Sequence, residues 1–191
     1  MAYTKTLLSA RLTLRPPRHG DEADLWAIHA DPAVMRYFSE PPWTDPARAA
    51  RQIDDDAGRF EREERFRFAI VLNETGRQIG NCMLFSLHRQ NRRAELGYAL
   101  ASAYWGRGYM HEALQALLGF AFTELDLLRL EADIDPRNVA SAASLTRLGF
   151  VPEGLLRERW IVADEVSDSA LYGLLRREWT GLATDSRAAS A

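Results

Sequence analysis

A segment with two closely spaced glycines, Tyr104 to Ala113, constrains the fold of this chain more than any other feature. Before it, the residues from Ala94 to Leu100 alternate and carry aromatic and aliphatic side chains, which predicts a strand. After it, the apolar spacing from Ala113 to Phe122 predicts a largely buried helix. Gly106 and Gly108 remove side chains where a ligand would approach the backbone, and the free amides of the first helical turn point outward at the positive end of the helix dipole. This unit of strand, turn and helix therefore predicts an anion-binding site.

Three familiar motifs fail at this turn. A dinucleotide fingerprint needs a third glycine where the chain has His111, and a nucleotide P-loop needs a Gly-Lys-Ser/Thr run that is absent. His111 and Glu112 resemble the start of a zinc protease helix, but Gln115 stands in place of the second histidine. We therefore expect neither a nucleotide site of these types nor a metal site.

A second segment downstream completes a recognisable pattern. It runs from Asp135 to Ser141 and continues from Leu145 to Val151. With the glycine turn, it resembles the acetyl-CoA site of the GNAT superfamily of N-acetyltransferases. The resemblance is closer still to the branch that includes the Rim-type ribosomal protein N-terminal acetyltransferases, and it extends from Arg11 to Leu175.

The resemblance implies a mixed α/β (α+β) GNAT fold, with a mostly antiparallel central sheet of about seven strands, splayed in the middle and flanked by about four helices. The sequence pattern agrees. It predicts strands at 11–15, 66–72, 78–87, 92–100, 128–134, 151–162 and 167–175, and helices at 21–30, 45–64, 113–122 and 138–147. We expect one domain over 1–180 and a flexible tail over 181–191.

Local features within these elements give further expectations. Asp21 and Asn138 are each placed to cap the start of a helix. The acidic triplet from Asp54 to Asp56 is either a solvated helix face or a rim that attracts a cationic substrate.

Composition indicates the cellular compartment and limits the classes of partner. The formal charge of −3 gives no general affinity for nucleic acid, and no apolar run is long enough to cross a membrane. The segment from Met1 to Lys5 lacks the apolar core of a secretion signal. The single cysteine, Cys82, excludes an internal disulfide and fits a buried thiol in a reducing compartment. We therefore expect a cytoplasmic protein.

The resemblance implies which residues hold acetyl-CoA. They lie at the end of the strand, in the glycine turn and at the start of the later helix: Ala99, Leu100, Trp105, Gly106, Arg107, Gly108, Tyr109, Met110, His111, Glu112, Asn138 and Ser141. Trp105 stands where the superfamily has Gln or Arg, and Met110 where it has Gly or Ala. Because a methionine narrows the space beside the cofactor, this departure bears on affinity more than on the type of reaction.

Two residues are candidates for catalysis. Glu95 matches the family's catalytic glutamate and would act as the general base, although it could instead face solvent or pair with Arg93. Ser141 matches the serine that donates to the departing thiolate, and its alternative role is hydrogen bonding at the helix start. Asn138 resembles the asparagine that binds the pantetheine arm, a role compatible with capping.

The implied activity is direct transfer of an acetyl group from acetyl-CoA to a primary amine. The branch resemblance points to a protein N-terminal α-amine, as in the ribosomal protein alanine and serine N-acetyltransferases. Two alternatives remain: acetylation of a small amine such as an antibiotic, polyamine or amino acid, and a non-catalytic protein that binds or senses acyl-CoA. A homodimer is an expectation from the family alone.

Overall fold

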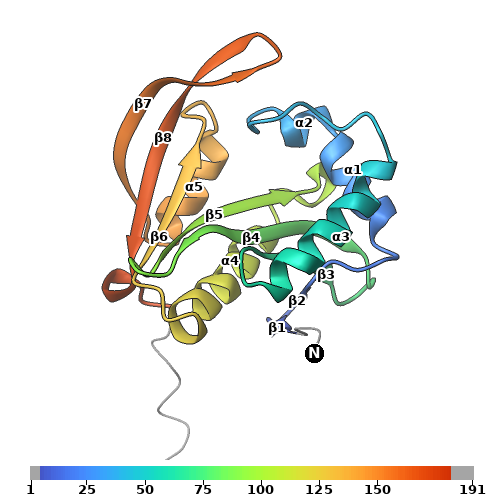
Figure 1. Cartoon of the computed structure of the whole chain (residues 1–191), viewed down its shortest axis with the longest axis horizontal. Helices are drawn as coiled ribbons and strands as arrows, with labels where there is room; N and C mark the ends of the chain where they lie inside the picture. The colour runs from blue at the N-terminus through green and yellow to red at the C-terminus, as the bar shows by residue number, and fades with distance from the viewer. Residues whose placement is uncertain (1–4, 182–191) are drawn as a thin grey trace, which may run out of the picture.

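A mostly antiparallel sheet of eight strands runs through the part of the chain that the computed structural model describes, residues 5–181 (Figure 1). The strands are β1 (Leu7–Leu8), β2 (Leu12–Arg15), β3 (Phe66–Leu72), β4 (Gln78–His88), β5 (Arg93–Leu100), β6 (Arg129–Ile134), β7 (Val151–Val162) and β8 (Glu165–Leu175). Their order across the sheet is β1-β2-β3-β4-β5-β6-β8-β7. Among the strands of the described residues, only β5 and β6 pair in parallel.

Helices cover both faces of the sheet (Figure 1). They are α1 (Glu22–Ala30), α2 (Pro32–Met35), α3 (Ala47–Glu61), α4 (Tyr109–Gly119) and α5 (Val139–Arg147). The largest core cluster joins α4, α5 and the end of α3, through Phe60, to the sheet, and two smaller clusters involve α1, α2 and the start of α3. In α4 the buried residues recur every three or four positions, at Ala113, Leu114, Leu117 and Leu118, as expected of a helix with one face on the core.

This architecture confirms the predicted GNAT fold with two additions within the described residues. The sheet has an eighth strand, β1, whose two residues are too few to show alternation in the sequence. The fifth helix, α2, has four residues and begins at Pro32, where the Ala33 amide donates a 2.8 Å bond to the Asp31 side chain. The predicted boundaries of β3 and β7 coincide with those of the structure. The predicted tail falls, from residue 182 onward, outside the described residues.

The two predicted caps turn out differently. Asn138 caps α5, since its side chain accepts a 3.0 Å bond from the Ser141 amide. Asp21 occupies the cap position of α1 but makes no side-chain cap bond, so that expectation is wrong. Its carboxylate instead accepts two 2.7 Å bonds from Arg15 and one of 2.9 Å from the Arg18 amide.

The sheet divides between β5 and β6, which confirms the predicted splay. The two strands pair over three positions only, the last being Glu95 opposite Glu131. Beyond this point β5 continues alongside β4 to Leu100, while β6 continues alongside β8 to Ile134. An opening therefore forms in the centre of the sheet.

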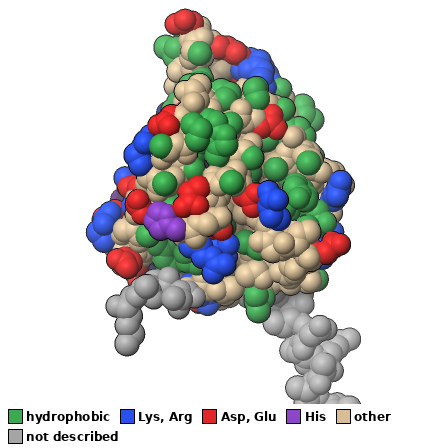
Figure 2. Space-filling model, turned by 90° about the vertical axis from the view of Figure 1, so that its right-hand side faces the viewer, with side chains coloured by type: hydrophobic (Ala, Val, Ile, Leu, Met, Phe, Trp, Pro, Cys, Tyr) green, Lys and Arg blue, Asp and Glu red, His purple; other side chains and the backbone are tan. Residues whose placement is uncertain are grey.

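The outer surface carries no field of a single sign on the face shown in Figure 2, where acidic and basic side chains are interspersed. Among the described residues, no helix is both long and apolar enough to span a bilayer.

A buried polar network lies between the sheet and the helices α1 and α3. Asp56 is 2% exposed and forms a 2.8 Å ion pair with Arg67, which in turn donates a 3.2 Å bond to Asn81. The Asn81 amide lies 3.1 Å from His29 Nε2, and the His29 ring stacks on Trp43. Neither interpretation of the acidic triplet therefore describes Asp56, which lies on the buried face of α3.

The buried imidazole predicts a dependence of stability on pH. Burial lowers the pKa of His29 to about 4, and the nearby Arg67 adds to the shift. Between that value and the ordinary pKa of about 6.5, the unfolded chain binds a proton that the native protein does not, so stability falls as the pH falls. At pH 5 the loss should be about 2 kcal/mol relative to pH 7. Urea unfolding of wild type and His29→Gln at both pH values measures it, and an equal acid loss in both proteins would contradict the assignment.

Candidate functional site

The glycine turn between β5 and α4 presents a row of free backbone amides. Gly106 and Gly108 have φ angles of 74° and 78°, a region in which residues with a Cβ are strained. No amide from Gly106 to His111 donates a backbone hydrogen bond within residues 5–181, whereas the Glu112 amide bonds to the Gly108 carbonyl at 3.1 Å. Six consecutive N–H groups at a helix N-terminus form an anion site, and the pyrophosphate of coenzyme A fits this donor set.

An ion pair fixes the cradle, defined here as residues 106–111, to the rest of the protein. Arg11, just before β2, forms a 2.7 Å ion pair with Glu112 and donates a 3.1 Å bond to the Arg107 carbonyl. Its guanidinium also lies 4.4 Å from the centre of the Tyr109 ring. Burial opposes ionisation of Glu112, but the bonds from Arg11 outweigh it and lower the pKa of this carboxyl. The side chains of Glu112 and Tyr109 therefore hold the cradle in place through Arg11. The backbone amides of the cradle remain available to a ligand.

The other predicted side chains of the cradle differ in their surroundings. Arg107 is exposed, and its guanidinium lies 5.9 Å from the centre of the Tyr104 ring. Met110 packs, partly buried, against the main core. His111 has a buried Nδ1 that has no hydrogen-bond partner in the described part of the chain.

The backbone of β5 offers a second set of amides beside the opening. The Ala101 amide donates to the Ile79 carbonyl, and because hydrogen-bonded pairs alternate along an antiparallel ladder, Ala99 also points its amide at β4. The amides of Tyr98 and Leu100 consequently point the other way, toward the side where β6 has left the sheet. These two N–H groups are placed to meet a carbonyl oxygen in the opening.

Trp105 contributes through its indole nitrogen. The ring is 50% exposed, and Nε1 donates a 2.8 Å hydrogen bond to the Leu100 carbonyl. That carbonyl therefore already accepts a hydrogen bond, while the Leu100 amide faces the opening as a donor.

A tyrosine and a serine meet across the opening. The Tyr98 hydroxyl lies 2.6 Å from Ser141 Oγ, which places β5 in direct contact with the first turn of α5. Burial raises the pKa of the Tyr98 phenol, and the hydrogen bond with Ser141 opposes this only in part, so the phenol stays protonated at neutral pH. Ser141 is itself buried, and Asn138 holds its amide.

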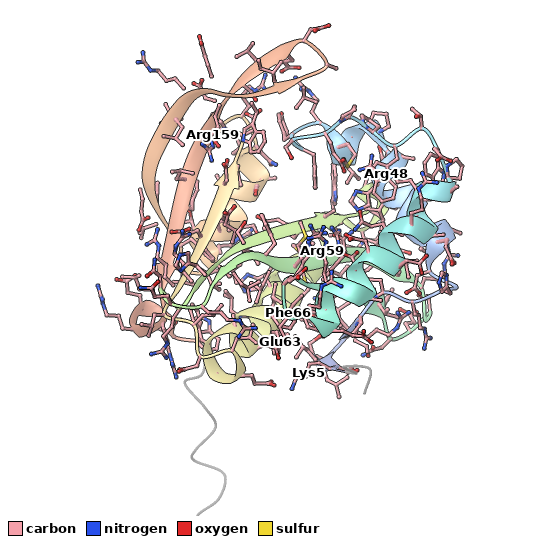
Figure 3. The ribbon with its side chains drawn as sticks, in the orientation of Figure 1. Lys5, Arg48, Arg59, Glu63, Phe66 and Arg159 are labelled. Atoms are coloured by element: carbon pink, nitrogen blue, oxygen red, sulfur yellow. The ribbon has the colours of Figure 1, made fainter. Side chains whose placement is uncertain are left out.

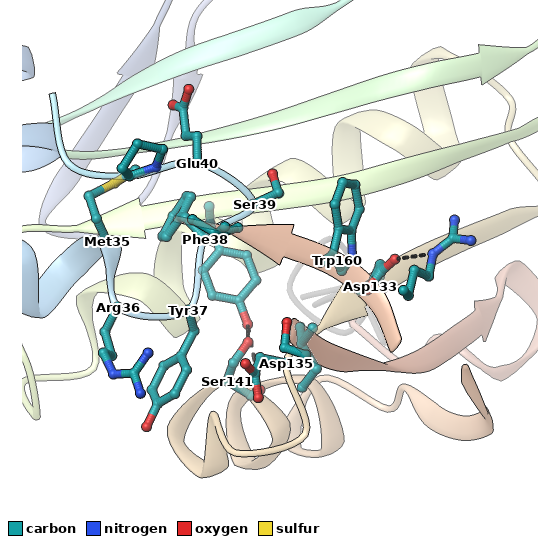
Figure 4. Close-up of a pocket in the computed structure, with 18 of the residues that line it drawn as sticks. Met35, Arg36, Tyr37, Phe38, Ser39, Glu40, Asp133, Asp135, Ser141 and Trp160 are labelled. Carbon is teal, nitrogen blue, oxygen red and sulfur yellow. Dashed lines mark hydrogen bonds and ion pairs between the residues drawn. The ribbon is translucent and has the colours of Figure 1, made fainter. Parts of the chain in front are cut away.

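A pocket of about 700 Å³ opens on the side of the sheet that carries α2, and both Glu95 and Ser141 line it. Figure 4 shows the segment from Met35 to Glu40 on one side and Trp160 with Asp133 on the other. Figure 3 likewise places Arg159 on the β7 side and Arg48 on the side of α3. Elements that are distant in sequence therefore form opposite walls of one pocket.

Four of the five carboxylates that line the pocket are neutralised by arginine. The pairs are Glu40 with Arg48, Asp133 with Arg159, Asp135 with Arg137, and Glu165 with both Arg36 and Arg137. Arginine hydrogen bonds lower the pKa of Asp135 and of Glu165. The lining carboxylates other than Glu95 therefore carry their charge already compensated.

Glu95 is the exception. Its carboxylate makes no hydrogen bond or ion pair with any described residue, and Arg93 pairs instead with Glu131 at 2.6 Å. The alternative in which Glu95 pairs with Arg93 is therefore not what the structure shows. Glu95 lies at the last position where β5 and β6 are paired, so its side chain enters the pocket beside the opening.

The structure brings Glu95 and Ser141 to one pocket and places the cradle at the end of the adjoining strand. Sequence reasoning did not identify Tyr98 as a site residue, although a tyrosine whose hydroxyl must find a partner inside a strand was a usable signal. Cys82 is fully buried, and burial raises the pKa of its thiol, so it lies in the core as predicted.

Known proteins share this pattern over most of the chain. The family model for the acetyltransferase (GNAT) domain matches residues 11–151. An uncharacterized N-acetyltransferase, p20 of Bacillus licheniformis, is 36% identical and covers 93% of this chain and 99% of its own length. Spermidine N(1)-acetyltransferase of Escherichia coli (strain K12) is 27% identical over 78% of this chain and 77% of its own length.

A solved structure shares the fold. RimL, a ribosomal L7/L12 α-N-protein acetyltransferase in complex with coenzyme A, superposes with a TM-score of 0.81 at 20% identity, covering 90% of this chain and 98% of its own. The expected donor, acetyl-CoA, is confirmed by the family match, since GNAT acetyltransferases use it. On the strength of the matched domain and of similarity along nearly its whole length, this chain belongs to the GNAT family of acetyltransferases.

Proposed function

We propose that this protein acetylates the α-amine of a peptide or protein N-terminus, with Glu95 as the general base. The observation that carries the proposal is the position of Glu95 where the sheet opens, as the one carboxylate lining the pocket that no described residue pairs with. An ammonium group is attracted to an unpaired carboxylate, and the same carboxylate can then accept its proton, directly or through water.

The charge of the pocket favours an acceptor with one amine. Spermidine carries several ammonium groups, and the four other carboxylates of the pocket are already paired with arginine. An α-amine has a pKa near 8 and a lysine near 10.4, so a lysine costs about 3 kcal/mol more to deprotonate at neutral pH. One carboxylate therefore serves an α-amine better than a lysine or a polyamine.

Each other group has a part in the proposed reaction. When bound, acetyl-CoA supplies an activated acetyl thioester. The cradle amides from Gly106 to His111 would hold its pyrophosphate, and Asn138, which caps α5, would hold its pantetheine arm through Nδ2, which donates to no described residue. The Leu100 amide would donate to an acyl oxygen in the opening, and amides oriented in this way are worth roughly 3 to 4 kcal/mol in other enzymes. The Ser141 hydroxyl, oriented by Tyr98, would donate a hydrogen bond to the departing thiolate.

The cradle can be tested with two matched glycines. Gly106 and Gly20 both have positive φ angles, and at both an added Cβ meets nothing within 4 Å. Gly106→Ala and Gly20→Ala should therefore lose similar stability from backbone strain, while only Gly106→Ala weakens coenzyme A binding, by about tenfold or more as amides shift. Calorimetric titration gives the affinities. Unchanged binding in Gly106→Ala would remove the cradle from the donor site.

The role of Glu95 can be tested by removing its charge. Glu95→Gln should lower kcat by about 10²- to 10⁴-fold at pH 7 with little change in coenzyme A affinity, and the defect should shrink at high pH, where the amine is already neutral. Glu74→Gln, which removes an exposed carboxylate from the turn between β3 and β4 outside the pocket, serves as the control and should keep full activity. Full activity in Glu95→Gln would place the base elsewhere. Tight coenzyme A binding by wild type without turnover on any amine would support the non-catalytic alternative.

The pairing of Tyr98 with Ser141 predicts coupled effects. Tyr98→Phe removes one hydrogen bond and should lower kcat about three- to tenfold, with a similar or larger loss in Ser141→Ala. Because Tyr98 acts through Ser141, the double variant should be no slower than Ser141→Ala alone. Steady-state kinetics of the four proteins measure the coupling, and strictly additive losses would show that the two hydroxyls act independently.

A further inference from the structure

We propose that Met83, Phe85 and Gly97 form a subsite beside Glu95. This subsite selects acceptors in which the carbon next to the amine carries an apolar side chain. This inference rests on the proposed function, because it assigns the group next to the amine that Glu95 binds. The chemistry it recognises is a single amine with an adjoining apolar group, as in a peptide that begins with Met, Leu or Phe.

The register of β4 and β5 brings the three subsite residues next to Glu95. Phe85 lies opposite Glu95, and Met83 lies opposite Gly97. Since side chains alternate along a strand, Glu95 and Gly97 share a face, and their direct partners on β4 point to the same side. All four residues line the pocket.

Gly97 creates the floor of the subsite by lacking a side chain. A Cβ at this position would lie 2.9 Å from Met83 Cε and 3.2 Å from Phe85 Cε1. The two β4 side chains therefore lie over the Gly97 backbone, immediately beside Glu95. Immediately after Phe85 the pairing with β5 becomes irregular and Ser86 has a φ of 49°, so the apolar floor ends at this bulge.

The wall facing this floor is also apolar. Met35 contributes from the end of α2, Phe38 from the segment after it, and Trp160 from β7 (Figure 4). Trp160 remains 39% exposed, and Met83 and Phe85 are partly exposed, so an acceptor side chain can still cover apolar surface here. Removing that surface from water favours an apolar side chain over Gly or Ser at the acceptor's first position.

The charge beside the apolar floor also limits which acceptors can bind. Glu95 is the uncompensated carboxylate beside this floor, and Met83, Phe85 and Gly97 add no charge of their own. A polyamine would bring its second ammonium against apolar side chains, which is unfavourable because a buried charge needs a partner. A peptide beginning with Asp would meet the negative Glu95. The subsite therefore favours one positive charge followed by apolar surface.

The first experiment compares kcat/KM for peptides that differ only in their first residue, Gly, Ser, Asp, Met, Leu or Phe, with spermidine and phenethylamine as further acceptors. We expect Met, Leu and Phe to exceed Gly and Ser by at least about tenfold, chiefly through KM. Equal values for Gly, Ser and the apolar peptides would overturn the subsite while leaving the proposed function intact. If phenethylamine were acetylated and none of the peptides were, the subsite would be supported and the peptide acceptor overturned. Preference for spermidine would overturn both.

Variants that change the subsite in opposite directions provide the second test. Met83→Ala and Phe85→Ala remove apolar surface and should reduce the Leu-to-Gly ratio of kcat/KM several-fold. Gly97→Ala keeps the surface but pushes Met83 outward, so it should raise KM most for the largest first residue. Leu155→Ala, an exposed residue of β7 outside this pocket, should leave the ratio unchanged. Coenzyme A affinity, measured on each variant, shows that the protein is folded, and an unchanged ratio in all three subsite variants would overturn the proposal.

Discussion

The short parallel pairing of β5 with β6 is the constraint on which the site depends. After Glu95 and Glu131 the two strands separate, and each keeps only its other neighbour in the sheet. Unpaired backbone amides would be costly in a closed sheet, yet here the amides of Tyr98 and Leu100 face an opening that can admit a ligand. The same opening joins the α5 side, where Ser141 lies, to the pocket that holds Glu95.

Arginine bridges position the walls of this pocket. Glu165, at the start of β8, contacts Arg36 after α2 and Arg137 before α5, so three distant segments meet at one carboxylate. Such exposed pairs contribute little to overall stability. Their consequence for the pocket is that arginine compensates the negative charge of every lining carboxylate except Glu95. In the function we propose, selectivity for the acceptor depends on that charge and on the apolar floor formed by Met83 and Phe85.

Local features were predicted well because local sequence decides them. The turn at Gly106 and Gly108 needs positive φ angles that glycine adopts without strain, and Asn138 caps α5 through a partner three residues away. Asp56 shows the limit of this reasoning. Its place in a run of acidic residues suggests solvent, but Ala49, Ile53 and Phe60 lie on the same face of α3, and that periodicity buries it against Arg67.

The sequence by itself determined the order of strands and helices, the glycine turn and the residue types that a GNAT acetyltransferase needs. It did not determine whether Glu95 is free or paired, because Arg93 could reach either Glu95 or a residue elsewhere. The pairing of β5 with β6 decides it, because it brings Glu131, 38 residues further along the chain, to Arg93. The contact between Tyr98 and Ser141, 43 residues apart, was decided in the same way. Partners this distant are selected by strand register and helix packing, and no local pattern encodes them.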